Sequence, residues 1–204
     1  MADNYLTIKE QAKGIYKEKG SKFLAFAYPV DSEDEALNII DNLRKEYFDA
    51  KHHCYAYSLG AKQKYYQTHD DGEPRHTAGD PILNQIRSFN VSDVLVIVVR
   101  YFGGTKLGKS GLIDAYKSAT KEALGKVDLV EKISVKVINI TFRYDGLNDV
   151  MRLINAKNLQ LIDQNYEKEC CIRVKVRDSE LFKIKGLFDV LPHVQEVKVL
   201  PGGS

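Results

Sequence analysis

The sequence has little of what would place the chain in a membrane or outside the cell. Its longest uninterrupted apolar run, residues 94–99, is far shorter than the roughly 20 residues needed to span a bilayer. The first residues, MADNYLTIKEQ, are polar and contain no apolar stretch typical of a signal peptide. We therefore expect a cytoplasmic protein that does not associate with membranes.

Cysteine is scarce as well, with 3 residues in a chain of 204. Cys170 and Cys171 are neighbours that would point to opposite faces of a strand, so they could hardly form a disulfide. No CxxC pair is present, which argues against a structural zinc site. We expect reduced thiols, a buried and inert Cys54, and neither a metal nor another cofactor.

Neither sign of charge dominates the composition. Lysine and arginine number 30 against 28 aspartate and glutamate, a formal net charge of +2. This value is too small to indicate nucleic-acid binding by the whole surface, so an electrostatic site must be a local cluster. Hydrophobic residues at 44% and charged residues at 28% are typical of a globular protein with a core.

The first part of the chain has the pattern of an α+β domain. Residues 94–99, VLVIVV, predict a strand buried on both faces, because nothing polar interrupts them. Ser32 and Glu35 form a capping box that predicts a helix start. The expected elements are a hairpin of strands 6–13 and 22–30 around KEKG, a helix at 31–48, a strand at 52–60, a polar loop at 68–81, a helix at 81–89, the strand at 94–99 and a helix at 111–125.

A second pattern begins near residues 127–131, where we place a domain boundary that divides the chain into 1–130 and 131–204. The second part reads strand, helix, strand, strand, helix, strand, which is the ferredoxin-like βαββαβ plan. In its third strand, alternation predicts Ile172, Val174 and Val176 inward and basic side chains outward. The expected ranges are 133–144, 147–156, 159–167, 169–177, 179–191 and 194–200.

The segment RYFGGTKLGKSGL, residues 100–112, contains the pattern G-x-x-x-x-G-K-S from Gly103 to Ser110, between a predicted strand and a predicted helix. Backbone N–H groups at a helix start attract anions, and a lysine there can reach phosphates. Nucleotide hydrolases with this loop also need a parallel sheet and a second apolar strand that ends in aspartate. The nearest stretch, VINITFRYD, is interrupted by polar residues, so a nucleotide hydrolase is disfavoured.

The same segment also suits the phosphate backbone of a nucleic acid. Residues 100–126 contain 6 basic and 2 acidic residues, a local net charge of 6 − 2 = +4. Tyr101 or Phe102 could stack on a base if exposed. The alternatives are a solvated helix face for lysines such as Lys117 and glycines that only permit a tight turn. For Lys106 and Lys109, which lie among four glycines, we favour an anion site.

A second cluster of polar groups lies in the loop 69–76 and the nearby His52 and His53. The loop could be a turn, a charged rim of the binding surface, or a catalytic or metal site. A turn is favoured, because no spacing of ligands forces these groups to converge. The residues of the expected rim are His52, Asp71, Glu73, Arg75 and His76.

Three stretches of the sequence resemble the YigZ/IMPACT family: AKHHCYAYSLG, DDGEPRHTAGDPIL, and GDPILNQI with VLVIVVRYFGGTKLGKSGLIDAYKSA. The resemblance covers almost the whole chain, and the RYFGGxKLG segment is highly specific. It implies an N-terminal domain with the ribosomal protein S5 domain 2-like fold. It also implies a second domain similar to the ferredoxin-like final domain of elongation factor G.

The resemblance has consequences for function. Both folds recur in proteins that touch ribosomes and RNA, and eukaryotic relatives are regarded as translational regulators in the amino-acid-starvation response. In the family pattern the position of Lys109 varies, so the match to the nucleotide-binding pattern is accidental and Lys106 is the better phosphate ligand. The sequence departs from the family at Arg75 and His76, where small residues are usual. The resemblance does not include the extra N-terminal interaction domain of the eukaryotic relatives, so we do not expect their regulatory partners to carry over.

We therefore expect a protein without catalytic turnover that binds RNA or the ribosome and regulates translation, with a translation factor or regulatory protein as a further partner. The alternative is a nucleotide or phosphoester hydrolase or kinase-like enzyme that uses the same loop with residues 69–76. A third class is a protein-interaction module. The residues expected to bind phosphate are Arg100, Gly103, Gly104, Lys106, Gly108, Lys109, Ser110, Gly111 and Lys117.

Overall fold

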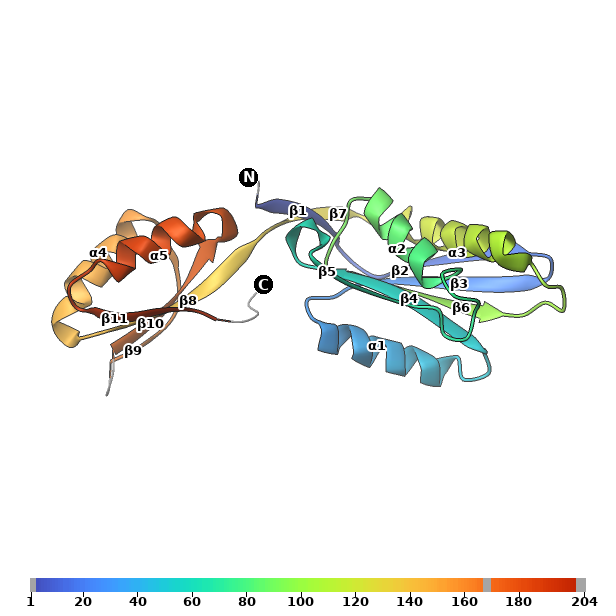
Figure 1. Ribbon diagram of the computed structural model, residues 1–204, viewed down its shortest axis with the longest axis horizontal. Helices are drawn as coiled ribbons and strands as arrows, with labels where there is room; N and C mark the ends of the chain where they lie inside the picture. The colour runs from blue at the N-terminus through green and yellow to red at the C-terminus, as the bar shows by residue number, and fades with distance from the viewer. Residues whose placement is uncertain (1–2, 167–169, 201–204) are drawn as a thin grey trace. The chain divides into compact units, whose positions relative to one another are not determined.

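The computed structural model describes residues 3–166 and 170–200, and it contains two compact units (Figure 1). The N-terminal unit is Tyr5–Lys132. The C-terminal unit runs from Ile133 onward and also includes Asp3 and Asn4. We predicted the boundary between residues 130 and 131, whereas the structure divides the chain after Lys132.

The N-terminal unit is built on a five-stranded antiparallel sheet with the order β2-β3-β6-β4-β5. The central strand β6 is buried along almost its whole length. A separate two-stranded sheet pairs β1 (Asn4–Ile8) with β7 (Leu129–Ile133). The strands of the large sheet are β2 (Ala12–Glu18), β3 (Ser21–Pro29), β4 (His52–Leu59), β5 (Tyr65–His69) and β6 (Val94–Tyr101).

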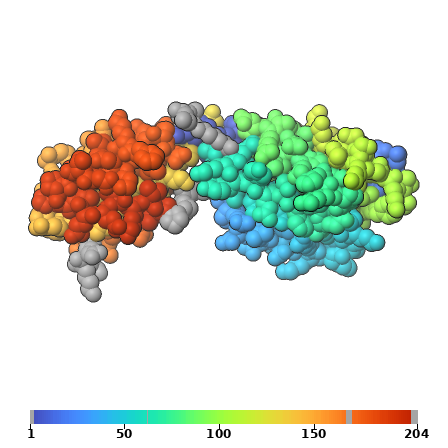
Figure 2. Space-filling model, viewed as in Figure 1, coloured from blue at the N-terminus to red at the C-terminus, as the bar shows by residue number. Residues whose placement is uncertain are grey.

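Helices cover both faces of this sheet (Figure 1). Helix α1 (Glu33–Glu46) packs on one face with alternate β6 residues such as Ile97. Helices α2 (Gly79–Ser88) and α3 (Gly108–Leu124) pack on the other face with the intervening β6 residues. Figure 2 shows the light-blue atoms of α1 and the yellow-green atoms of α3 on opposite sides of this unit. The prediction of a strand buried on both faces is confirmed.

Three local predictions for this unit were wrong. The hairpin partner of β3 is β2, not residues 6–13. Leu6 and its neighbours belong to β1, which pairs with β7 near the C-terminal end of this unit's sequence. Strand β5 was missed because its side chains are mostly exposed and show no apolar alternation. Helix α3 begins at Gly108, three residues before the predicted start at 111.

The C-terminal unit has the predicted βαββαβ order and a four-stranded sheet with the order β11-β8-β10-β9, so the ferredoxin-like prediction is confirmed. In β10, Ile172, Val174 and Val176 are buried as predicted. The predicted strand ends at residues 167 and 169 lie outside the described residues. The elements are β8 (Val135–Phe142), α4 (Leu147–Ala156), β9 (Gln160–Asn165), β10 (Cys170–Arg177), α5 (Leu181–Asp189) and β11 (Val194–Val199).

Short 3₁₀ turns occur at Ala61–Gln63, Tyr144–Gly146 and Asp178–Glu180. None of the helices in residues 3–166 and 170–200 is both long and apolar enough to cross a membrane.

Candidate anion-binding cleft

The glycine loop, residues 102–107, connects β6 to α3 and is held in place by the turn between β2 and β3. A Cβ atom added to Gly103 would lie 1.9 Å from the carbonyl carbon of Gly20, so only glycine permits this approach of the two backbones. The Gly103 N–H donates a hydrogen bond to Ser21 Oγ at 3.1 Å. Gly103 therefore fixes the loop, and its amide is not available to a ligand.

The N-terminus of α3 follows the glycine loop and has no side-chain cap within the described residues. The N-cap residue is Leu107, whose side chain cannot accept a hydrogen bond, and the first turn contains no acidic residue. The backbone N–H groups of Gly108, Lys109 and Ser110 have no acceptors inside the helix. They present the positive end of the helix dipole, which attracts anions.

A cleft of about 380 Å³ lies beside this helix start. Three basic residues and one acidic residue contribute to it, together with the first helical glycine and an apolar wall. The lining residues are Glu73, Pro74, Arg100, Phe102, Lys106, Leu107, Gly108, Lys109 and Leu112. Neither Lys106 nor Lys109 forms an ion pair with a described residue. The cleft therefore combines two unpaired ammonium groups with an uncapped helix start.

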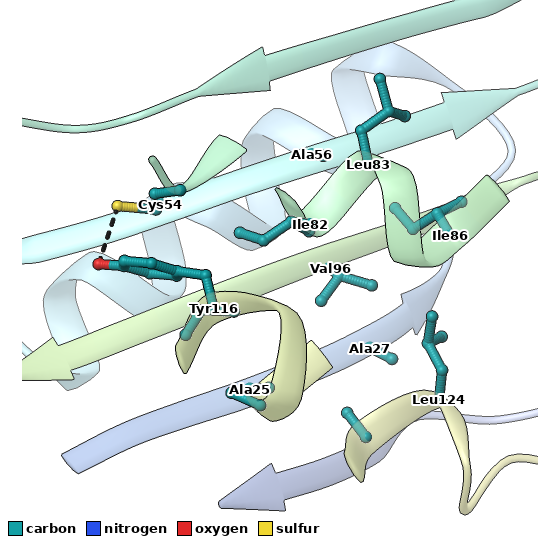
Figure 3. Close-up of a cluster of buried hydrophobic side chains, with 14 of the residues drawn as sticks. Ala25, Ala27, Cys54, Ala56, Ile82, Leu83, Ile86, Val96, Tyr116 and Leu124 are labelled. Carbon is teal, nitrogen blue, oxygen red and sulfur yellow. Dashed lines mark hydrogen bonds between the residues drawn. The ribbon is translucent and has the colours of Figure 1, made fainter. Parts of the chain in front are cut away.

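Buried polar groups form a connected chain behind the cleft. Arg100 Nη1 donates to Glu73 Oε1 at 2.6 Å, and the Tyr116 hydroxyl donates to the same oxygen at 2.8 Å. The Cys54 thiol lies 3.3 Å from the Tyr116 hydroxyl oxygen (Figure 3) and 2.9 Å from the Asp70 carbonyl oxygen. Burial raises the pKa of the Cys54 thiol and of the Tyr116 phenol, so both stay protonated at neutral pH.

Arg100 is the most deeply buried cation of the cleft, with 5% of its surface exposed. Its guanidinium carbon lies 5.4 Å from the ring centre of Phe23 and 5.6 Å from that of Phe102. Its Nε atom is buried and has no hydrogen-bond partner among the described residues. Burying a charged donor without an acceptor is costly. Arg100 therefore keeps one guanidinium donor unsatisfied, and this atom is enclosed by the protein.

The loop between β5 and α2 is held by two aspartates. Asp70 accepts hydrogen bonds from the N–H groups of His76, Ala78 and Gly79 at 2.8 to 3.0 Å, so it caps the start of α2. Asp71 accepts from the N–H of His53 at 2.7 Å and from Arg44 Nη2 at 3.1 Å. These contacts are those of a structural turn, the interpretation that we favoured. Within the described residues no group of three or more His, Cys, Asp or Glu could hold a metal ion.

The structure brings together only part of the predicted site. Of the predicted phosphate ligands, Arg100, Lys106, Gly108 and Lys109 line the cleft. Glu73, one of the predicted rim residues, also lines the cleft and forms an ion pair with Arg100. The remaining predicted residues are not among its described lining: His52, Asp71, Arg75, His76, Gly103, Gly104, Ser110, Gly111 and Lys117.

Two aromatic residues, at the end of β6 and directly after it, differ in accessibility, which the sequence left open. Phe102 lines the cleft and is 52% exposed, so its ring is accessible. Tyr101 packs on the α1 side of the sheet and donates to Asp49 at 2.7 Å. Of the two, Phe102 is the one placed to stack on a ligand.

Sequence reasoning did not identify the Arg100–Glu73 ion pair, nor the cleft residues Pro74, Leu107 and Leu112. An arginine at the end of an otherwise apolar buried strand was the available signal, because a buried charge requires a partner. The identity of that partner depends on the path of the loop 70–78, which no local pattern encodes.

Comparisons with known proteins agree with this fold. The model of the Impact N-terminal domain matches residues 19–124. The IMPACT family member YvyE of Bacillus subtilis is 30% identical over 180 residues, covering 88% of this chain and 83% of the relative. The IMPACT family member YigZ of Escherichia coli is 32% identical over 158 residues, covering 76% of this chain and 78% of the relative. A solved structure described as a hypothetical protein has a TM-score of 0.72 at 26% identity, covering 98% of each chain. The chain belongs to the IMPACT family.

Proposed function

We propose that this protein binds RNA through the cleft at the start of α3 and thereby regulates translation, without catalytic turnover. The observation that carries the proposal is the presence of the unpaired Lys106 and Lys109 in one cleft with an uncapped helix start. Each of these groups donates hydrogen bonds, and together they favour a ligand rich in anionic oxygens. The phosphates of RNA fit this requirement.

The link to translation rests on family membership. Eukaryotic members of the IMPACT family are regarded as translational regulators, and the ribosome offers RNA phosphate at high local density. Binding is preferred to catalysis because Glu73, the carboxylate of the cleft, is already engaged by Arg100 and Tyr116. In the described lining no histidine accompanies it as a proton carrier.

The proposal is tested by replacing both free ammonium groups of the cleft. The variant Lys106→Ala with Lys109→Ala should bind a single-stranded RNA of about ten nucleotides roughly tenfold or more weakly, because it loses two charge-assisted contacts. The slope of log affinity against log salt should flatten by about 1.4, since single strands lose about 0.7 per phosphate contact. Fluorescence anisotropy across a salt series measures both quantities.

The matched control is Lys45→Ala with Lys51→Ala. Lys45 is exposed in the last turn of α1, on the opposite face of the sheet, and Lys51 is exposed in the loop before β4. Neither lysine is among the described lining of the cleft, and the change removes the same charge. The control should retain the affinity and the slope of the unmodified protein. Equal affinity of the cleft variant and the unmodified protein would refute RNA binding at this cleft.

The ribosomal part of the proposal has a separate measurement. The unmodified protein should sediment with ribosomes through a sucrose cushion at moderate salt, and the Lys106→Ala, Lys109→Ala variant should remain largely in the supernatant. Sedimentation of both proteins to the same extent would place ribosome contact elsewhere on the molecule.

A further inference from the structure

The cleft is more mixed in chemistry than a surface that follows a nucleic-acid backbone. Its floor includes Arg100 and Glu73, whose side chains are 6% and 4% exposed. A backbone phosphate of a duplex lies on the outside of a smooth helix and is flanked by further backbone on both sides. A group that projects from the end of a chain can enter the cleft.

The charges of the cleft match a doubly charged group. Glu73 offsets the charge of Arg100, which leaves the ammonium groups of Lys106 and Lys109 and the partial positive charge at the start of α3. An internal phosphodiester carries one negative charge and offers two unbridged oxygens. A terminal phosphomonoester carries between one and a half and two negative charges near neutral pH and offers three oxygens. The terminal group can therefore accept from more of the donors that line the cleft.

The wall of the cleft is suited to stacking with a nucleobase. Phe102 is half exposed and lines the same cleft as the cations, next to the apolar side chains of Leu107 and Leu112. Aromatic rings beside cationic groups bind unpaired bases by stacking, whatever the base identity. The volume of about 380 Å³ lies within the range of small-molecule pockets, so one nucleotide can be accommodated.

From these observations, and resting on the proposed RNA binding, we infer that the cleft captures the terminal nucleotide of single-stranded RNA that ends in a phosphate. The phosphomonoester lies on Lys106, Lys109 and the α3 start. The base stacks on Phe102. Because the cleft recognises a terminal phosphate and a base face, it selects chain ends over internal positions and does not select sequence.

The test compares three versions of one oligonucleotide of about ten residues, labelled at an internal position so that both ends stay free. One version carries a 5′-phosphate, one a 3′-phosphate, and one has hydroxyl groups at both ends. We expect one of the phosphorylated versions to bind about tenfold or more tightly than the hydroxyl version. In Lys106→Ala, Lys109→Ala this preference should disappear, whereas Lys45→Ala, Lys51→Ala should keep it.

Stacking is tested separately with Phe102→Leu, which keeps an apolar side chain at an exposed position and so should leave the fold intact. This variant should bind the preferred oligonucleotide about tenfold more weakly and still distinguish it from the hydroxyl version. Adenosine 5′-monophosphate should compete with the RNA for the unmodified protein. Unchanged affinity of Phe102→Leu would overturn the stacking assignment.

The outcomes separate this inference from the proposed function. If all three oligonucleotides bind equally and binding still depends on Lys106 and Lys109, RNA binding at the cleft stands and recognition of the terminal phosphate is wrong. If the cleft variant binds every oligonucleotide as well as the unmodified protein does, both are wrong.

Discussion

At the scale of single residues, Gly103 illustrates how one missing side chain positions the cleft. A Cβ atom at this position would lie 1.9 Å from the backbone of Gly20, so Gly103→Ala must displace the loop or the β2–β3 turn. We expect a loss of about 1–3 kcal/mol in the free energy of unfolding, measured by urea denaturation, and weaker RNA binding. Gly186→Ala is the contrasting change. Gly186 lies inside α5 with nothing within 4 Å of an added Cβ, so alanine should stabilise the protein by about 0.5–1 kcal/mol. A neutral effect of Gly103→Ala would show that the two backbones separate easily.

His53 is the second residue with a measurable consequence. Its side chain is buried under α1, and its Nε2 atom has no partner among the described residues. Burial lowers the pKa of His53 from 6.5. Asp71, with Oδ2 3.9 Å from His53 Nδ1, and the backbone of Tyr47 oppose this shift, whereas Arg44 and His52 lower the pKa further.

The sign of the pH effect follows from this lowered pKa. The unfolded chain takes up a proton on His53 at a higher pH than the folded protein does, so stability rises with pH in this range. The contribution of His53 is complete above the unfolded pKa of 6.5 and is lost as the pH falls below it. We expect the free energy of unfolding to decrease between about pH 7 and pH 5, and less so in His53→Gln. Histidine titration by NMR provides the check: a His53 pKa at or above its ordinary value would contradict the assignment.

At the scale of elements, the ion pair between Arg100 and Glu73 connects the end of β6 to the loop before α2. Both side chains are almost fully buried, so removing one leaves an uncompensated charge. Glu73→Ala and Arg100→Met should each cost about 3 kcal/mol, and the double variant should cost at least about 1 kcal/mol less than their sum. An exposed pair such as Lys185–Asp189 should cost under about 1 kcal/mol when Lys185 is replaced by alanine. Additive costs at Glu73 and Arg100, measured by denaturant unfolding, would mean that the two charges do not depend on each other.

The elements also show which features of the fold a sequence can reveal. Strand β6 and the alternating strand β10 were predictable because burial imposes a pattern on neighbouring residues. Strand β5 was not predictable because an exposed edge strand is defined by its partner β4, and its own residues show no apolar period. Strand β1 was wrongly assigned to the hairpin for a related reason. Its partner β7 lies at the other end of this unit's sequence, so no local pattern indicates the pairing.

The cleft residues also divide into those that the sequence reveals and those that only the fold reveals. Lys106 and Lys109 could be predicted because glycines and a helix start surround them in the sequence itself. The pairing of Arg100 with Glu73 and the accessibility of Phe102 required the fold, since both depend on where the loop 70–78 and the turn at Gly20 come to lie.

At the scale of the whole molecule, the two units carry basic residues in different electrostatic settings. On the C-terminal sheet, Arg173 Nη1 lies 3.6 Å from Asp163 Oδ2, and Lys198 Nζ lies 2.8 Å from Glu196 Oε2. These cations therefore have carboxylate partners, whereas Lys106 and Lys109 form no ion pair with a described residue. A paired cation gains less from a phosphate, because the phosphate must displace or share its partner.

This difference predicts that RNA binding depends on the cleft of the N-terminal unit and not on the C-terminal sheet. Arg173→Gln with Lys198→Gln removes two positive charges, the same number as Lys106→Ala with Lys109→Ala. The C-terminal variant should keep the RNA affinity within about twofold and the salt slope unchanged, because exposed ion pairs contribute little and no phosphate contact is lost. The measurement is anisotropy over the same salt series for both variants. A comparable loss of affinity and slope in the two would mean that RNA contacts both units, and the selectivity for chain ends would then have to arise from more than the cleft.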